Sequence, residues 1–278
     1  MKPRMLQLLV FVLLVGTWGF AEALEPLKPY DNFEQSLINP DKWAGNEFHF
    51  GGSFLDLARK TTQEEHHLQI LNRFFNQTNS DTEESFGLFR LGFTRPETIT
   101  AIRSSVQVRN VESTGCADNP TPTRATVQLF GFFFSTNATV PGDATSDVIA
   151  GVSVRHRSDS TDPPDVLEIF YFVALCLDPS CIKSPFLGSG VLGTVKTGEW
   201  VTLLVQWDKK PHRFIFQRDK EQPVFVTYKG FHDDAAPGVP VKTLGADHFV
   251  ANCAKDPRPV GMVDARFDDV FVNKSAQP

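Results

Sequence analysis

Beyond its first two dozen residues, the sequence lacks any long apolar run. Its most apolar later stretch, Leu129–Phe134, is followed directly by the polar residues Ser135, Thr136 and Asn137. A membrane-spanning helix needs about 20 consecutive apolar residues. This part of the chain therefore contains no predicted membrane span.

The chain also lacks a basic patch interleaved with aromatic residues. It has 27 Lys and Arg against 33 Asp and Glu, which gives a net charge of −6. Proteins that bind nucleic acid usually carry clustered positive charge on one face. Nucleic acid is therefore not an expected partner.

Familiar catalytic and metal-binding motifs are missing too. There is no Gly-x-Ser-x-Gly elbow to expose a nucleophilic serine, and neither His-Glu-x-x-His nor paired Cys-x-x-Cys spacing occurs. Of seven histidines only His66 and His67 are adjacent, and neighbouring side chains on a strand point to opposite faces. Neither a serine hydrolase nor a zinc site is expected.

The N-terminus has the three parts of a secretory signal peptide. Lys2 and Arg4 precede an apolar run over Met5–Val15, and Ala21-Glu-Ala23 supplies a small-x-small cleavage site. The alternative, a retained anchor helix, is disfavoured because Leu6–Phe20 is shorter than a bilayer span. We expect residues 1–23 to be removed and residues 24–278 to form a secreted protein, extracellular or periplasmic.

Four cysteines form an even set, which predicts two disulfides in an exported protein. Three pairings are possible. Cys176 and Cys181 bracket an Asp-Pro-Ser turn, where the chain reverses and the two side chains can approach. We therefore expect the disulfides Cys176–Cys181 and Cys116–Cys253.

From about residue 86 onward, turn signals recur about every ten residues, and the runs between them are rich in Val, Ile, Phe and Thr. Apolar and polar residues alternate within several runs, which is typical of strands with one buried face. Glycine and proline, at 19 each, disfavour long helices. The clearest expected strands are Ile99–Val108, Arg124–Phe134, Asp147–His156, Asp165–Leu175, Trp200–Trp207, Arg213–Arg218, Val224–Tyr228 and Val260–Val272.

The rest of the chain is less regular. Thr61–Gln77 fits a helix, but a short strand over Leu68–Arg73 explains the same stretch. The longest segments expected to be irregular are Val111–Thr123, Pro179–Thr197 and Gly230–Pro259, and long loops often carry function. No linker or repeat divides the chain, so a single all-β domain is expected over residues 24–278.

Three segments resemble the concanavalin A-like lectin and glucanase superfamily. They are Tyr30-Asp-Asn-Phe33 with Leu37–Trp43, the hairpin Gly198–Asp208 with Arg213–Asp219, and the closing segment Asp264–Val272. The resemblance implies an antiparallel two-sheet jelly-roll sandwich whose last strand returns beside the first, with a face that often binds polysaccharide. It does not fix an activity, because lectins, hydrolases, lyases and adhesion modules share this architecture.

The carboxylates do not complete the hydrolase pattern of that superfamily. Its best-known branch carries Glu-x-Asp-x-x-Glu on one strand, whereas here Asp165-Val-Leu-Glu168 is preceded by Pro163 at the first carboxylate position. A spacing of three also places Asp165 and Glu168 on opposite faces of a regular strand. Glu168 is a catalytic candidate only if another strand supplies its partner, so whether the protein is an enzyme stays open.

Strand parity defines a candidate ligand-binding face. Planar hydrogen-bonding groups and an aromatic platform suit a sugar, and the alternative is the ordinary polar exterior of a sheet. Phe130, Phe132 and Phe134 share the parity of Gln128 and need to be covered by a loop, a sheet or a partner. The candidate residues opposite in parity to the most apolar positions are Arg103, Gln107, Gln128, Arg155, Glu168, Phe170 and Gln206.

A structural Ca²⁺ is the metal that the resemblance suggests. If the first and last strands adjoin, Asp31 and one or both of Asp268 and Asp269 would supply oxygen ligands. The alternative is that these carboxylates protect sheet edges from aggregation. No other cofactor is expected.

The sequence therefore predicts a secreted jelly-roll module that binds a polysaccharide or surface glycan without catalysis. The alternatives are a polysaccharide hydrolase or lyase acting through Glu168, and a cell-surface interaction protein that binds another protein. The oligomeric state is not predicted.

Overall fold

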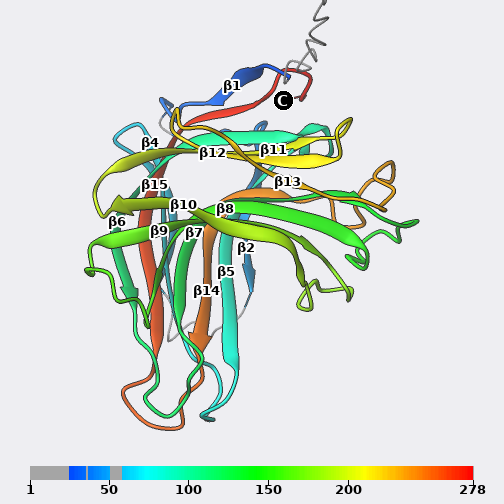
Figure 1. Ribbon diagram of the computed structural model, residues 1–278. Helices are drawn as coiled ribbons and strands as arrows, with labels where there is room; N and C mark the ends of the chain where they lie inside the picture. The colour runs from blue at the N-terminus through cyan, green and yellow to red at the C-terminus, as the bar shows by residue number, and fades with distance from the viewer. Residues whose placement is uncertain (1–24, 36, 51–57, 278) are drawn as a thin grey trace, which may run out of the picture.

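The computed structural model describes residues 25–35, 37–50 and 58–277, and β-strands dominate this part of the chain (Figure 1). The described residues form fifteen strands and one short 3₁₀ helix, Pro96–Thr98. Within these ranges, no helix has the length and apolarity to cross a membrane. The predicted signal peptide and its cleavage site after Ala23 lie outside the described residues.

The strands form two antiparallel sheets. The first has the order β13-β12-β11-β6-β15-β4-β3, with β1 pairing on β15. Its strands are β1 (Leu27–Asp31), β3 (Ala58–Glu64), β4 (His67–Phe75), β6 (Ala101–Ser113), β11 (Trp200–Asp208), β12 (Arg213–Arg218), β13 (Val224–Thr227) and β15 (Val260–Asn273).

The second sheet has seven strands in the order β10-β9-β8-β7-β14-β5-β2. Its strands are β2 (Trp43–Phe50), β5 (Glu84–Phe93), β7 (Arg124–Ser135), β8 (Asp147–Arg157), β9 (Val166–Leu175), β10 (Phe186–Lys196) and β14 (Lys242–Ala251). Figure 1 shows both sheets curving, with β14 between β7 and β5.

The connectivity is that of the jelly roll which the resemblance implied. The last strand, β15, pairs with the first, β1, with Leu27 opposite Asn273. The segment that resembled a late hairpin forms β11 and β12, with Asp208 opposite Arg213. The prediction of an all-β, concanavalin A-like two-sheet sandwich is confirmed.

Two strands form where irregular chain was expected. The segment Pro179–Thr197 contains β10, whose glycine-rich sequence looks like a turn but pairs along β9 at the edge of the second sheet. The segment Gly230–Pro259 contains β14, which lies between β7 and β5. In addition, Thr61–Gln77 forms strands rather than a helix, because β3 and β4 pair as a hairpin.

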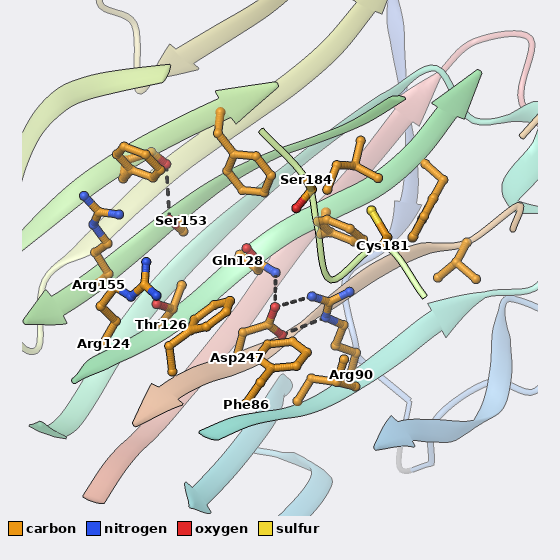
Figure 2. A pocket seen from close by; sticks show the side chains of 18 of the residues that line it. Phe86, Arg90, Arg124, Thr126, Gln128, Ser153, Arg155, Cys181, Ser184 and Asp247 are labelled. Atoms are coloured by element: carbon orange, nitrogen blue, oxygen red, sulfur yellow. Dashed lines mark hydrogen bonds and ion pairs between the residues drawn. The ribbon is translucent and has the colours of Figure 1, made fainter. Parts of the chain in front are cut away.

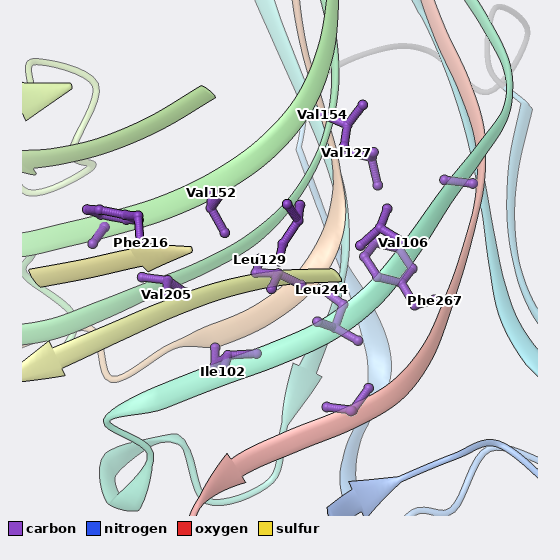
Figure 3. Close-up of a cluster of buried hydrophobic side chains, with 14 of the residues drawn as sticks. Ile102, Val106, Val127, Leu129, Val152, Val154, Val205, Phe216, Leu244 and Phe267 are labelled. Carbon is purple, nitrogen blue, oxygen red and sulfur yellow. The ribbon is translucent and has the colours of Figure 1, made fainter. Parts of the chain in front are cut away.

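The core lies between the two sheets and is filled by inward-facing apolar side chains from both. Figure 3 shows this layer, in which Val106 and Phe267 of the first sheet face Val127 and Leu129 of the second. All four are fully buried. Each side chain of this size contributes about 1.5–3 kcal/mol on burial, so the alternation seen in the sequence accounts for the sandwich.

An irregularity in β7 corrects the expectation for Phe134. The register against β8 shifts between Phe132 and Phe134, which pair with the consecutive residues Ile149 and Val148. A bulge of this kind reverses which face the following side chain takes. Phe130 and Phe132 therefore stay on the outer face, whereas Phe134 lies in the core and stacks on Trp207 with ring centroids 5.0 Å apart.

The two disulfides join the cysteines in the expected pairs. Cys116, after β6, bonds to Cys253, after β14, across a sequence separation of 137 residues. Cys176 bonds to Cys181 in the short loop after β9. The first disulfide closes a long loop, and the second fixes a small one.

Candidate functional site

A pocket of about 440 Å³ lies on the outer face of the second sheet (Figure 2). Its base is formed by alternate residues of β5, β14, β7, β8 and β9. On β7, Val127 and Leu129 point into the core, so Gln128 and Phe130 point into the pocket. Seven phenylalanines and three arginines line this hollow, which we call the Phe–Arg pocket: Phe86, Phe130, Phe132, Phe170, Phe172, Phe186, Phe249, Arg90, Arg124 and Arg155.

A three-residue polar network forms the floor of the Phe–Arg pocket. Arg90 Nε donates to Asp247 Oδ1 at 2.7 Å, and Arg90 Nη2 donates to Asp247 Oδ2. Gln128 Nε2 donates to the same Oδ2 at 2.7 Å. All three residues are buried, so a network of charge-assisted hydrogen bonds holds their orientation.

Gly245 makes this arrangement possible. It lies opposite Arg90 on β5 and opposite Gln128 on β7. A Cβ atom at this position would lie 2.5 Å from the Arg90 Cγ and 2.7 Å from its Cα. The missing side chain thus leaves the space through which Arg90 reaches Asp247.

Each arginine of the pocket lies over a phenylalanine ring. The guanidinium carbon is 4.1 Å from the ring centroid for Arg90 over Phe130. The corresponding distances are 4.3 Å for Arg124 over Phe249 and 3.6 Å for Arg155 over Phe170. Cations are attracted to aromatic faces, and a planar guanidinium stacks well there. These contacts fix the guanidinium groups against the wall.

One end of the pocket is bounded by a loop. Ser180, Cys181 and Ser184 of the segment after β9 line it, and Figure 2 shows Cys181 and Ser184 at the opposite end from Arg124 and Arg155. A small apolar cluster that includes Phe132, Ile149 and Val241 packs beneath this loop. This end of the pocket is therefore covered.

Asp178 organises the covering loop from within. Its carboxylate accepts hydrogen bonds from the Ser180 hydroxyl at 2.7 Å and from the backbone N–H groups of residues 180, 182 and 183. The Ser180 hydroxyl and these backbone donors lower the pKa of Asp178 to about 2. Together with the Cys176–Cys181 disulfide, these bonds give the loop a defined shape.

At the other end, two arginines are paired with glutamates. Arg155 donates from Nε to Glu168 Oε1 at 2.6 Å, and Arg124 donates from Nη2 to both oxygens of Glu84 at 2.6 and 2.7 Å. Burial lowers the pKa of Arg155; Glu168 opposes this shift, and the nearby Arg157 and Arg124 add to it. Two further hollows adjoin this end, and both have Arg155 in their lining.

The structure brings together four of the seven predicted ligand-binding residues. Gln128, Arg155 and Phe170 line the Phe–Arg pocket, and Glu168 lies beside it, bonded to Arg155. These four residues come from β7, β8 and β9, which are neighbours in the second sheet. In the described part of the chain, Glu168 is paired with Arg155, and Asp159 and Asp162 line the adjoining hollow together with Glu168.

The other three predicted residues belong to the first sheet. Arg103 and Gln107 lie on β6 and Gln206 on β11, with side chains on the face turned away from the second sheet. Arg103 packs over Phe271 at 4.0 Å, and Gln107 donates to the Gly198 carbonyl at 2.7 Å. The prediction of one groove containing all seven residues is wrong, because strand parity gives the face of a side chain but not the sheet.

Several residues of the pocket were not predicted. Arg90 and Phe86 lie on β5, Asp247 and Phe249 on β14, and Arg124 begins β7. The alternation that predicts a strand is present in β14, where Leu244, Ala246 and Val250 alternate with outward-facing residues. It was obscured because His248 occupies a core-facing position, where it is fully buried.

Two of the three carboxylates proposed as calcium ligands have other contacts. Although β1 and β15 pair as expected, Asp31 accepts a hydrogen bond from Trp43 Nε1 at 2.7 Å and lies 3.5 Å from Lys42 Nζ. Asp268 lies 3.7 Å from His67 Nε2. Among the described residues, these three carboxylates do not form a cluster, and the one such group of potential ligands is Asp81 with the disulfide-bonded Cys116 and Cys253. Asp31 instead anchors the tryptophan of the first turn.

Comparisons with known proteins locate similar structures but no family. No protein-family model matches the sequence, and no curated protein matches it. Among solved structures, the chain is similar to LamAcat from Zobellia galactanivorans, at 10% identity and TM-score 0.48, covering 88% of this chain and 96% of that one. It is also similar to a beta-1,3-glucanase from Mycobacterium marinum, at 12% identity and TM-score 0.46, covering 88% and 98%.

A third similar structure is the carbohydrate-binding module CBM66 from Bacillus subtilis. The identity is 12% and the TM-score 0.30, with 77% of this chain and 90% of that chain covered. Similarity at this level concerns the fold alone. The side chains of the Phe–Arg pocket are what bears on the ligand.

Proposed function

We propose that this protein binds a glycan in the Phe–Arg pocket and does not chemically alter it. The observation that carries the proposal is the polar floor of Asp247, Gln128 and Arg90 surrounded by phenylalanine rings. A sugar ring has an apolar face of C–H groups and an edge of hydroxyls, so it suits a site with aromatic walls and fixed hydrogen-bonding groups. Ligand sites generally combine an apolar lining with a few oriented polar groups.

The size of the pocket is compatible with this proposal. Its volume of about 440 Å³ falls in the range of roughly 300–1,000 Å³ that is typical of small-molecule sites. The pocket is covered at the Cys181 end, and further hollows adjoin it at the Arg155 end. A glycan would therefore place one end under the loop and extend past Arg155.

The state of the carboxylates supports binding rather than catalysis. Glycoside hydrolysis uses two carboxyl groups, one to protonate the leaving oxygen and one to act as base or nucleophile. Asp247 accepts two hydrogen bonds from Arg90 and one from Gln128, and Glu168 is bonded to Arg155. Each of these two carboxylates is held in an ion pair with an arginine, so neither can reach a glycosidic bond without leaving its partner.

We also propose that the protein acts outside the cytoplasm. Its two disulfides are typical of oxidising compartments, and the leader over residues 1–23 has the pattern of a signal peptide. Mass determination of the exported protein tests this, because a mature chain that begins at Leu24 is expected.

Binding is tested with a glycan array that covers plant, algal, bacterial and host polysaccharides, followed by calorimetry on each hit. Phe170→Ala removes one wall of the pocket and is expected to weaken binding. Phe225→Ala is the matched control, since Phe225 is also stacked by an arginine, Arg213 at 4.6 Å, but lies on β13 of the other sheet. The absence of binding to every polysaccharide would remove the proposal.

The same samples distinguish binding from catalysis. Incubation of each bound polysaccharide with the protein is expected to release neither reducing ends nor unsaturated sugars. Release of either product that Glu168→Gln abolishes would instead make the protein a hydrolase or lyase acting through Glu168. A stable protein partner without any glycan binding would favour the interaction-protein alternative.

A further inference from the structure

Three arginines form a cluster at the open end of the Phe–Arg pocket. Arg124 on β7 and Arg157 on β8 are directly opposite each other across the two strands, and Arg155 is two residues from Arg157 on the same face. Like charges directly opposite each other destabilise a sheet. One hollow contains Arg124, Arg155 and Arg157 together in its lining. We call these three residues the arginine cluster.

The carboxylates that neutralise this cluster stand largely to the side of the pocket. Glu84 bonds to Arg124, Glu168 to Arg155 and Asp159 to Arg157, and none of these three carboxylates lines the Phe–Arg pocket. Glu83 and Glu84 do line the adjoining hollow in which the three arginines meet. Inside that lining, Arg90, Arg124 and Arg155 are accompanied by a single carboxylate, that of Asp247. The excess of positive charge is confined to the lining of the Phe–Arg pocket, because each arginine of the cluster has a carboxylate partner outside that lining and the whole chain has a net charge of −6.

The carboxylate partners also leave some guanidinium N–H groups of the arginine cluster without a carboxylate contact. Arg155 contacts Glu168 at Oε1 through Nε and Nη2, and Arg124 contacts Glu84 through Nη2. Arg157 contacts Asp159 through Nε and Nη2. A guanidinium carries five N–H donors in a planar fork that matches carboxylate and sulfate oxygens. Because Arg155 and Arg124 are also fixed on Phe170 and Phe249, little side-chain freedom remains to be lost when an anion binds.

We infer that the protein is selective for acidic glycans, whose carboxylate or sulfate groups are bound by Arg124, Arg155 and Arg157. The inference rests on the proposed function, since it assigns the class of glycan that the same pocket takes. The sugar ring would lie between the phenylalanines, and its anionic substituent, or that of the next residue, would face the arginine cluster. Glu84 and Glu168 would then be competitors for the arginines rather than ligands of the sugar.

The first test compares polymers that differ in charge. Calorimetry pairs polygalacturonate with its fully methyl-esterified form, polymannuronate with mannan, and carrageenan with agarose, so that carboxylate and sulfate are tested separately. At least one acidic polymer is expected to bind about tenfold or more tightly than its neutral counterpart, because hydrogen bonds to charged groups are the stronger ones. Raising the salt concentration should weaken the acidic polymer alone, since salt screens exposed charges.

Variants separate an anion site from a merely structural ion-pair network. Arg155→Gln and Arg124→Gln are expected to lower affinity for the acidic polymer about tenfold, whereas Glu168→Gln is expected to raise it by freeing Arg155. The matched control is Arg266→Gln, because Arg266 also pairs with a glutamate, Glu65 at 2.7 Å, but lies on β15 of the other sheet. Opposite changes in affinity for Arg155→Gln and Glu168→Gln cannot come from unfolding, because unfolding would weaken binding in both variants.

The outcomes distinguish this inference from the proposed function. Binding to neutral glycans with no preference for any acidic counterpart overturns the inference and leaves glycan binding intact. No binding to any polymer of either kind overturns both. Weaker binding of the acidic polymer by Glu168→Gln also overturns the inference, because that glutamate would then contact the sugar.

Discussion

Arg90 and Asp247 form a buried ion pair with two hydrogen bonds between neighbouring strands, β5 and β14. Removing one partner of such a pair leaves an unpaired buried charge, which typically costs about 3–5 kcal/mol. We expect Arg90→Met to lower the free energy of unfolding by about 3 kcal/mol and to weaken glycan binding. Urea denaturation measures the first effect and calorimetry the second.

The double variant Arg90→Met with Asp247→Leu tests whether the pair serves stability or the site. Replacing both charges by apolar groups often restores stability, so the double variant is expected to recover most of the loss. It is not expected to recover binding, because the polar floor is gone. A double variant that binds as well as the natural protein would show that Asp247 and Arg90 take no part in the site.

The two disulfides are expected to contribute unequally to stability and to function. In the chain-entropy view, a loop as long as that between Cys116 and Cys253, with a separation of 137 residues, stabilises by about 4–5 kcal/mol. The loop between Cys176 and Cys181, with a separation of 5 residues, stabilises by about 2 kcal/mol. Replacing each pair by serines should show this order in urea denaturation.

Binding should show the reverse order. Cys181 lines the Phe–Arg pocket, whereas the Cys116–Cys253 disulfide does not. The variant without the Cys176–Cys181 disulfide is therefore expected to lose more affinity than the variant without the Cys116–Cys253 disulfide, because its covering loop is less defined. Equal affinity in the two folded variants would mean that the loop does not contact the ligand.

The fold could be predicted largely because core-facing and outward-facing residues alternate in β8 and in β7 before its irregularity at Phe132–Phe134. Val127 and Leu129 in β7 and Val152 and Val154 in β8 all face the core, and period-two alternation is the strongest local signal of a half-buried strand. The pairing of β15 with β1 was implied by the family resemblance and is present. Local pattern together with resemblance was thus sufficient for the architecture.

The site could be predicted only in part, for two physical reasons. Parity assigns a side chain to a face but carries no information on which sheet the strand joins, so Arg103, Gln107 and Gln206 were grouped with Gln128. Tertiary burial also overrides local composition. His248 in β14 and Lys242 at its start are both buried polar residues, and such residues make a central strand look like a loop.

His248 is expected to make stability depend on acidic pH. Burial lowers its pKa to about 4, and Nε2 lies 3.2 Å from the Asn72 carbonyl oxygen. An unfolded histidine has a pKa near about 6.5, so between these values the unfolded chain binds a proton that the folded protein excludes. The free energy of unfolding should therefore fall as the pH decreases from about 6.5 to about 4.

The contribution of His248 is measured against His248→Gln, which cannot gain this proton and keeps an amide donor for Asn72. The difference in unfolding free energy between the two proteins cancels the titration of the shared carboxyl groups. The stability advantage of the natural protein over His248→Gln should decrease as the pH falls. A difference that stays constant from about pH 7 to about pH 4 would assign the acid sensitivity to other groups.

Lys242 is expected to have an effect of the same sign at alkaline pH. It is fully buried, donates from Nζ to the Phe132 carbonyl, and lies 4.7 Å from the centroid of the Phe133 ring. Burial lowers its pKa to about 7, whereas an unfolded lysine has a pKa near about 10.4. Between these values the unfolded chain holds the proton that the folded protein has released, so the free energy of unfolding should rise with pH.

Lys242→Met isolates this effect, because methionine keeps an unbranched apolar chain without the ammonium group. Burying a charge is unfavourable unless it is paired, so the variant is expected to be at least as stable as the natural protein near pH 7. Urea denaturation from about pH 7 to about pH 9.5 should show the natural protein gaining stability relative to the variant. A different outcome would be a variant that is less stable than the natural protein at pH 7 and whose unfolding free energy changes with pH to the same extent. It would mean that the ammonium group is stabilised in the folded protein by its contacts with Phe132 and Phe133.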